Sequence, residues 1–236
     1  MSRQSEFGQP IGFALPDWRS PPRPPREAMK GRFCRVEPID LERHARELYE
    51  ANALDPDARH WTYLPYGPFE SFEAYQSFVR AICLGDDPLF FAIVDARTDR
   101  AVGLASYLRI DTRVGSIEVG HLRFSSLLQR TPAATEAMAL MMRRAFELGY
   151  RRYEWKCDSL NAPSRAAALR LGFVFDGVFR QANIVKGRNR DTAWFSVTDR
   201  EWPTCARAFE RWLDTSNFDA QGRQRVRLEA LRGGGT

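Results

Sequence analysis

Hydrophobic and polar residues alternate over short stretches of the chain, and between these stretches apolar residues recur every three or four positions. Alternation is typical of strands and the longer period of helices. The pattern predicts strands at 32–37, 89–95, 101–109, 116–124, 152–157, 173–185 and 192–198. It predicts helices starting near Asp40 and at 71–81, 132–148, 163–171 and 201–213. The strand–helix–strand unit over 116–157 implies a parallel pair, and the hairpins imply antiparallel pairs. We expect an α/β (mixed α+β) fold with a mostly antiparallel sheet of about seven strands and helices on both faces.

Both ends of the chain differ from this body. Residues 1–28 are rich in proline, which predicts an extended arm, partly polyproline II, yet the arm also carries Phe7, Phe13 and Trp18. Such apolar residues indicate packing on the arm's own body or on a second subunit, as in a homodimer joined through the arm. We expect a single domain over 29–215, a basic tail over 216–236 and frayed residues at 233–236.

The formal net charge of +5 invites a nucleic-acid interpretation, but most of the excess lies in residues 1–31 and 203–236. Because the body is nearly neutral, the charge does not favour a nucleic-acid-binding domain, although arginines in the arms leave phosphate binding open. Four widely spaced cysteines predict reduced thiols in a cytoplasmic protein. The longest apolar runs are too short to cross a bilayer. The three histidines, His44, His60 and His121, are too dispersed to predict a metal site, and we expect structural or surface roles for them.

One segment combines several features of an anion site. Residues 129–137 enter the strongest helix with small side chains in its first turn, and Arg130 adds a positive charge beside it. A helix start exposes unpaired N–H groups and the positive end of the helix dipole. The same residues are also explained by an ordinary helix start, with Thr131 as N-cap and Pro132 in the first turn. Both interpretations stay open on the residues alone.

Gln129-Arg130-Thr131-Pro132-Ala133-Ala134-Thr135-Glu136-Ala137 resembles the acyl-CoA-binding motif of the GNAT superfamily of N-acetyltransferases, especially its ribosomal-protein-alanine (RimJ/RimL-like) branch. Further fragments over residues 29–202 fit that branch in the right order. They are Lys30-Gly31-Arg32, Glu118-Val119-Gly120-His121, Asn161-Ala162-Pro163-Ser164 with Gly172-Phe173, Asp176-Gly177-Val178-Phe179-Arg180 and Lys186-Gly187-Arg188. Arg130 and Pro132 stand where the motif has glycines, and Pro132 cannot donate an N–H to a phosphate.

The resemblance implies that an amine attacks the thioester of acetyl-CoA directly, without a metal, between two parallel strands that splay apart. It implies that N–H groups at Leu122–Phe124 polarise the thioester, and that Gln129, Arg130, Thr131, Ala133, Ala134 and Thr135 bind the cofactor with Asn161 and Ser164. Glu118 is the candidate base, with a solvent-facing or arginine-paired carboxylate as the alternative. Ser164 is the candidate acid, because the helix 163–171 lacks the tyrosine that many relatives use. Ser164 and Asn161 are also explained as helix-start residues.

The same resemblance implies that the acceptor, a small-molecule amine or a peptide N-terminus, enters beside Trp61, Tyr63 and Tyr66, with Tyr107 nearby. Loop-to-core anchoring is the alternative for the aromatic residues. Two other functions stay open: an acyl-CoA-binding module without catalysis, because of Arg130, Pro132 and the missing tyrosine, and a nucleic-acid binder, because of the charge. Neither the pattern nor the resemblance identifies the acceptor.

Overall fold

The computed structural model describes residues 3–55 and 57–233. Within these residues, eight strands form one twisted sheet in the order β3-β4-β5-β6-β7-β8-β10-β9, and only β7 and β8 are parallel. The strands are β3 (Met29–Lys30), β4 (Cys34–Pro38), β5 (Leu89–Asp95), β6 (Ala101–Asp111), β7 (Ser116–Phe124), β8 (Arg152–Asp158), β9 (Val174–Val185) and β10 (Arg188–Thr198). The mixed, mostly antiparallel sheet is confirmed, with one strand more than expected, the two-residue β3.

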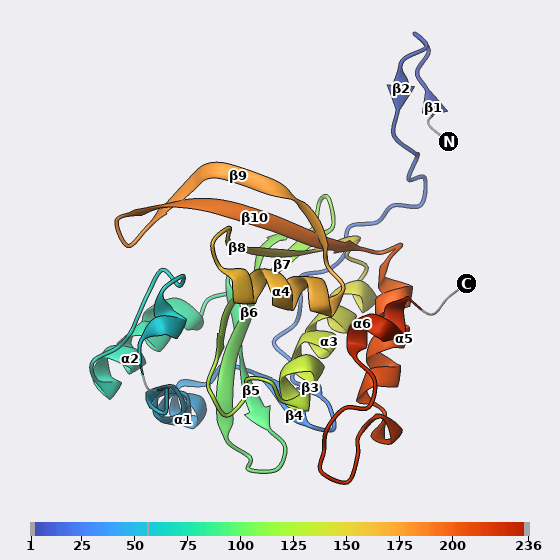
Figure 1. Cartoon of the computed structure of the whole chain (residues 1–236). Helices are drawn as coiled ribbons and strands as arrows, with labels where there is room; N and C mark the ends of the chain where they lie inside the picture. Colours follow the sequence, from blue (N-terminus) through green and yellow to red (C-terminus); the bar gives the residue numbers. More distant parts are fainter. Residues whose placement is uncertain (1–2, 56, 234–236) are drawn as a thin grey trace.

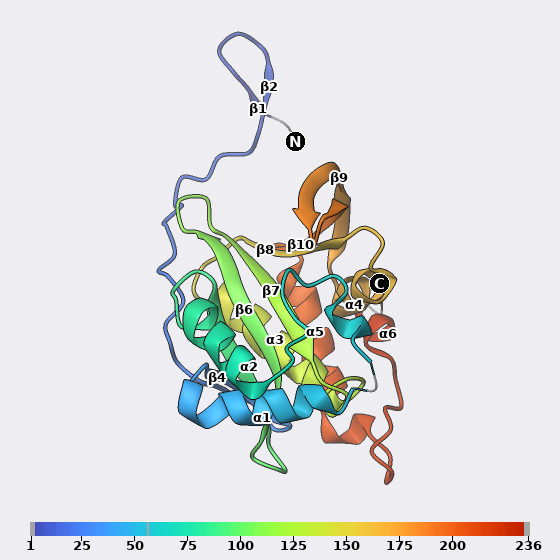
Figure 2. The ribbon, with the colours of Figure 1, turned by 90° about the vertical axis from the view of Figure 1, so that its left-hand side faces the viewer.

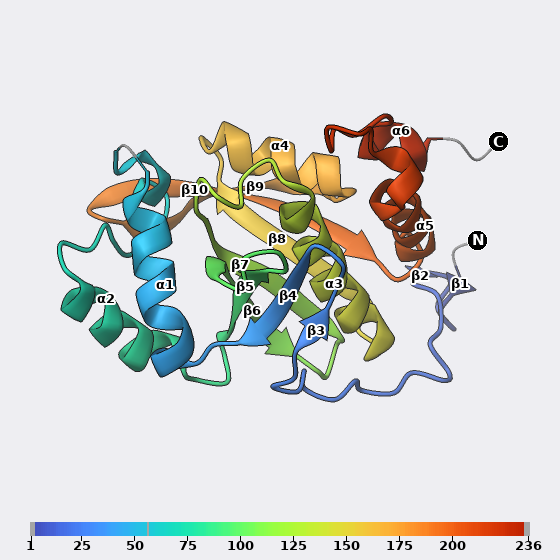
Figure 3. The ribbon, with the colours of Figure 1, turned by 90° about the horizontal axis from the view of Figure 1, so that it is seen from below.

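Helices cover both faces of this sheet (Figures 2 and 3). On one face lie α1 (Leu41–Ala53) and α2 (Phe72–Phe78), which continues into a π-helical turn at Val79–Cys83. On the other lie α3 (Pro132–Glu147), α4 (Ala162–Leu171) and α5 (Trp202–Leu213). α1 and α3 bury their apolar sides against the sheet, as the helical period predicted, whereas α2 packs mainly on α1, and α5 on α3 and on α6 (Leu228–Arg232).

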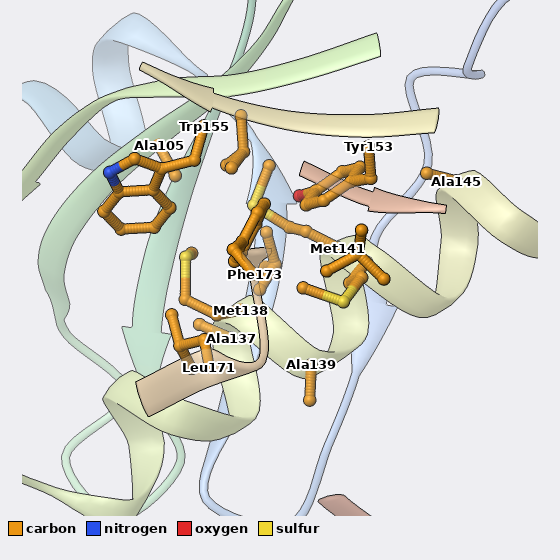
Figure 4. Packing of buried hydrophobic residues seen from close by; sticks show 14 of the residues in the cluster. Ala105, Ala137, Met138, Ala139, Met141, Ala145, Tyr153, Trp155, Leu171 and Phe173 are labelled. Carbon is orange, nitrogen blue, oxygen red and sulfur yellow. The ribbon is translucent and has the colours of Figure 1, made fainter. Parts of the chain in front are cut away.

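Two hydrophobic cores result, one on each side of the sheet. The larger core packs α3 against the strands through Ala137, Met138 and Met141, which lie at helical spacing, and Figure 4 shows them beneath Tyr153 and Phe173. All four cysteines are buried free thiols. The described helices include none long and apolar enough to span a membrane.

The start of the N-terminal arm projects away from the body (Figure 1), and contact with the body begins at Phe13, whose ring lies under the Arg200 guanidinium at 3.9 Å. Trp18 Nε1 donates to the Arg113 carbonyl, and Tyr150 Oη donates to the Pro22 carbonyl. Its start forms a small hairpin of β1 (Arg3–Gln4) and β2 (Pro10–Ile11), which the proline content did not predict. Phe7 and other apolar residues of the projecting part are exposed. The homodimer through this arm stays a prediction.

The C-terminal segment folds back on the domain instead of leaving it. After a 3₁₀ turn at Thr215–Asn217, α6 (Leu228–Arg232) buries Leu228 in the larger core. Arg232 Nη2 donates to the Leu169 carbonyl at the end of α4, at 2.9 Å. The described part of the expected basic tail is therefore packed structure, whereas the expected fraying at 233–236 falls, from residue 234 on, outside the described residues.

Candidate active site

The two parallel strands at the centre of the sheet separate part of the way along. β7 and β8 pair only from Ser116–Arg152 to Val119–Trp155, although both strands run on beyond this point. Just past the last pair, one extra residue bulges from β7 opposite β6, and His121 adopts a positive φ of 52°. A bulge bends and twists its strand. The facing edges of β7 and β8 are therefore left unpaired with each other.

A cavity of about 460 Å³ lies where these strands part. The site residues proposed from the sequence that line it are Tyr63, Glu118, Leu122, Asn161 and Ser164. They come from a loop after α1, from β7 and from the start of α4. The structure thus brings together the candidate base, the candidate acid and one candidate acceptor contact.

The Glu118 carboxylate lies in the cavity wall between two cations. Its Oε2 is 2.7 Å from Arg109 Nη1 and 2.9 Å from Lys156 Nζ, and Glu118 is 3% exposed. Burial raises the pKa of Glu118, and the charges of Lys156 and Arg109 oppose that shift. Lys156 also contacts Glu154 Oε2 at 2.8 Å and lies over the Trp194 ring. The arginine-paired interpretation is therefore observed, in a carboxylate that also faces the cavity.

Asn161 and Ser164 both act at the start of α4. Asn161 Oδ1 accepts from the Ser164 N–H at 3.1 Å, which makes Asn161 the N-cap. Ser164 Oγ accepts from Trp155 Nε1 at 3.0 Å and also contacts the Cys157 side chain, so either that sulfur or a group in the cavity can accept its proton. Asn161 and Ser164 therefore have the roles expected of residues at a helix start. Each side chain can still form a further hydrogen bond to a ligand.

The loop before α3 has the geometry of an N-capped helix start with spare donors. Thr131 Oγ1 accepts from the Ala134 N–H at 3.3 Å, and Gln129 Nε2 donates to the Phe124 carbonyl. Among the described residues, no acceptor is found for the N–H groups of Arg130 and Ala133. The Thr135 hydroxyl accepts a hydrogen bond from Arg170 Nη1 on α4 at 3.0 Å, so this expected cofactor contact is directed toward α4. The cap and an anion site therefore coexist.

The aromatic residues expected near the acceptor divide into three roles. Tyr63 lines the cavity and donates to the Leu160 carbonyl. Trp61 and Tyr66 support the wall from behind: Trp61 lies beneath the Arg123 guanidinium, and Tyr66 stacks on His121 with its hydroxyl 3.1 Å from Nδ1. Tyr107 is fully buried on the other face of the sheet and donates to the Met141 carbonyl, so the structure places it outside the site.

Several cavity residues were not singled out by the sequence analysis. His121 was expected to be structural or on the surface, but it lines the cavity, where burial and Arg109 lower its pKa to about 4. Lys156 lies on the same face of β8 as Glu154 and Asp158. These charges alternate with Trp155 and Cys157, and that pattern could have indicated a polar face on this strand.

The β9–β10 hairpin reaches over toward the α1–α2 side and contacts the loop that covers the cavity (Figure 1). At its tip, Lys186 Nζ donates to the carbonyls of Trp61 at 2.8 Å and Gly67 at 2.6 Å. Arg188 Nη2 donates to the Thr62 carbonyl at 2.9 Å. We call these three bonds the hairpin latch. They fix the position of the loop that carries Tyr63.

The family model for the acetyltransferase (GNAT) domain matches residues 35–174. The chain is similar to a crystal structure of a GCN5-related N-acetyltransferase from Brucella melitensis, with 43% identity and a TM-score of 0.90 over 92% of this chain and 99% of that one. It is also similar to a probable GNAT-family acetyltransferase from Chromobacterium violaceum ATCC 12472, with 43% identity and a TM-score of 0.77 over 83% and 98% of the two chains. A curated relative, an uncharacterized N-acetyltransferase p20 from Bacillus licheniformis, is 24% identical over 71% of this chain and 99% of its own length.

Proposed function

Because this chain belongs to the GNAT acetyltransferase family, we propose that it transfers the acetyl group of acetyl-CoA to a primary amine by direct attack in a ternary complex. The observation that carries the proposal is the cavity where β7 and β8 part, with a buried carboxylate in its wall. The acceptor is a small-molecule amine or a protein N-terminus. The RimJ/RimL-like branch and the cytoplasmic location expected from the sequence stay predictions.

The unpaired strand edges and the α3 loop fit the two ends of acetyl-CoA. An extended pantetheine carries amides that pair with exposed strand edges as an added strand would. The N–H groups of Arg130 and Ala133, with the Arg130 guanidinium, suit its phosphates. We assign the N–H groups of Leu122–Phe124 to the thioester carbonyl, where they would stabilise developing negative charge. The cofactor supplies the activated acetyl group.

Glu118 is the proposed base. An alkylammonium has a pKa near 10 and a peptide α-ammonium near 8, so the amine must lose a proton before it attacks. Glu118 lines the cavity with its Oε2 oriented by Arg109 and Lys156, and we propose that it takes the proton through a water molecule. His121 also lines this wall, and with a pKa of about 4 it is a weaker base.

Ser164 is the proposed proton donor to the leaving thiolate. Because thiol pKa values lie near 8.5, that group needs little assistance at neutral pH. The Ser164 hydroxyl lines the cavity and accepts a hydrogen bond from Trp155, which orients its proton away from the indole. The remaining amide protons of Asn161 suit a pantetheine carbonyl.

A catalytically impaired acyl-CoA-binding module is the second candidate, because Pro132 removes one N–H from the phosphate loop. Isothermal calorimetry with acetyl-CoA and release of free CoA thiol with a panel of amines distinguish the two. Amine-dependent thiol release supports the transferase. Binding without release for any amine supports the module, and no binding at millimolar acetyl-CoA rejects both.

The charge of Arg130 is expected to compensate for the missing N–H of Pro132. Arg130→Ala should raise the Kd for acetyl-CoA about fivefold to tenfold at low salt, because a charged contact to phosphate is removed. The difference should shrink at 300 mM salt as the charge is screened. Calorimetry at both salt concentrations measures it, and Arg143→Ala, an arginine on α3 that pairs with Glu210, is the matched control. Equal affinities of the wild type and Arg130→Ala at low salt would contradict this role.

A further inference from the structure

Three side chains of β10 have buried polar atoms for which the described residues offer no hydrogen-bond partner. Arg190, Thr192 and Trp194 alternate along the strand, so they share one face, and all three line the cavity. Arg190 Nε, Thr192 Oγ1 and Trp194 Nε1 are each buried without a hydrogen-bond partner among the described residues. Thr192 is only 4% exposed. Buried polar groups in native proteins are nearly always paired, so three together in one cavity wall indicate a ligand.

The chemistry of these atoms determines what kind of ligand group they suit. The Arg190 and Trp194 nitrogens only donate, and a threonine hydroxyl can donate as well. The complementary group is therefore a hydrogen-bond acceptor. Since an arginine guanidinium stays ionised, and Arg190 makes no ion pair within the described residues, the complementary group is also an anion.

The other cations in the cavity wall are already neutralised. Arg109 pairs with Glu118, and Lys156 pairs with both Glu118 and Glu154. Arg190 is thus the cation in this wall that is left for a ligand. A carboxylate suits it because guanidinium groups bind carboxylates in a planar, two-bond geometry.

The position of these three residues connects them to the amine rather than to the distant phosphates of acetyl-CoA. β10 pairs with β8, with Trp194 opposite Lys156 and Thr192 opposite Asp158. Lys156 contacts both Glu118 and the Trp194 ring, so the base and the β10 residues lie on the same face of the sheet. The loop before α3, which we propose for the phosphates, does not line this cavity.

We propose that the acceptor is an amine that also carries a carboxylate, and that Arg190, Thr192 and Trp194 bind this carboxylate while Glu118 acts on the amine. This inference rests on the proposed acetyl transfer. The Phe179 ring, 4.6 Å from the Trp194 ring, supplies an apolar wall beside the carboxylate subsite. Free amino acids and peptides with an acidic side chain near the N-terminus share this chemistry.

The test compares matched acceptors on the full chain. Acetyl transfer is measured for the twenty amino acids, for their C-terminal amides, and for short peptides with and without an acidic second residue. We expect wild-type kcat/KM to favour carboxylate acceptors over their amides at least tenfold. Arg190→Met should reduce this preference about 10- to 100-fold. Thr192→Val keeps the shape of the side chain and removes its donor, and Trp194→Phe removes the indole donor and leaves a smaller aromatic ring; each should reduce the preference about threefold to tenfold.

The control is Arg180→Met, an exposed arginine of β9 that does not line this cavity. It should leave the preference unchanged, and melting temperatures should show that all variants are folded. An equal preference in Arg190→Met and wild type overturns the inference. So does an Arg190→Met variant whose KM rises for acetyl-CoA rather than for the acceptor. A preference confined to the acidic peptides assigns the subsite to a peptide side chain instead of a free amino acid.

A binding experiment distinguishes failure of the carboxylate subsite from failure of the proposed acetyl transfer. Calorimetry titrates each carboxylate probe, without acetyl-CoA, into wild type and Arg190→Met. Carboxylate binding that weakens at least tenfold in the variant supports the subsite even if no amine is acetylated. Absence of carboxylate binding together with acetylation of the amides overturns the subsite and leaves the transferase intact. Absence of acetyl-CoA binding counts against the proposed function alone.

Discussion

Replacing Glu118 by glutamine is expected to lower kcat for acetyl transfer about 10²- to 10³-fold at pH 7, because the amine then reaches the thioester without its base. Glutamine keeps the size of the side chain and removes its ability to take a proton. The Kd for acetyl-CoA should stay within about twofold, since Glu118 lies outside the α3 loop. Stopped assays of CoA release measure kcat, and calorimetry measures the Kd.

The rate of acetyl transfer should depend on pH differently in the wild type and in Glu118→Gln. Glu118 works as a base only when ionised, and burial raises its pKa above the ordinary value. Wild-type activity should therefore fall as the pH drops through that raised pKa. In the glutamine variant the rate should instead rise steadily toward the pKa of the amine itself. The loss should be largest near neutral pH and should shrink toward pH 10.

Glu154→Gln is the matched control for the Glu118 variant. Glu154 pairs with the same Lys156 but does not line the cavity. A loss that came only from disturbing the ion pairs would be similar in both variants. Retention of most activity in Glu154→Gln, with an altered pH profile only in Glu118→Gln, is expected. An unchanged pH profile in Glu118→Gln would reject its role as base.

Replacing Glu136 by alanine is expected to lower the free energy of unfolding by about 3–5 kcal/mol. Its buried carboxylate accepts three backbone N–H groups at the start of β4, from Arg32 at 2.8 Å, Phe33 at 2.6 Å and Cys34 at 2.8 Å. Each buried donor left without a partner costs about 1–3 kcal/mol. Urea unfolding monitored by tryptophan fluorescence measures the loss. Glu147→Ala, an exposed glutamate of the same helix, should change stability by less than about 0.5 kcal/mol.

Gly31 provides a second test of the Glu136 contact. A Cβ at this glycine would overlap the Glu136 carboxyl group, so Gly31→Ala should also destabilise the wild type. Because the clash is with that one side chain, Gly31→Ala should cost much less in a Glu136→Ala background. A double-mutant cycle measures this coupling. Additive effects, or a loss below about 1 kcal/mol in Glu136→Ala, would contradict the anchoring role.

Glu136 also illustrates what the sequence could and could not predict. It was noticed as part of the motif at 129–137, whereas its partners lie about a hundred positions earlier in the chain. The local pattern predicted β5, a continuous apolar run, and β7, an alternating stretch, with their observed bounds, because both signals depend only on neighbouring positions. The pairing between distant segments depends on register, which a single sequence does not reveal.

The expected and observed sites also differ because of turn length and strand register. The strands expected at 173–185 and 192–198 leave the polar residues 186–191 outside both strands. In the structure only Lys186 and Gly187 connect β9 to β10, both with positive φ. β10 therefore starts at Arg188, and Arg190 becomes a strand residue that lines the cavity. The bulge at His121 likewise adds one residue that alternation does not predict. Glu118 was found through the family resemblance, and its cationic partners follow from the strand order.

The hairpin latch has a consequence for how this enzyme can diverge from its relatives. The parts proposed to receive the acetyl donor belong to β7, β8, α3 and the start of α4. The loop proposed to face the acceptor is held by the tip of the two-stranded β9–β10 ribbon. Mutations at the tip of that ribbon, beyond the β10 residues that pair with β8, are expected to reshape the entrance while the pairing of β8 is kept. If the proposed sites are correct, acceptor choice and donor binding are carried by separate segments of the chain, and substitutions at the hairpin tip should change the first while preserving the second.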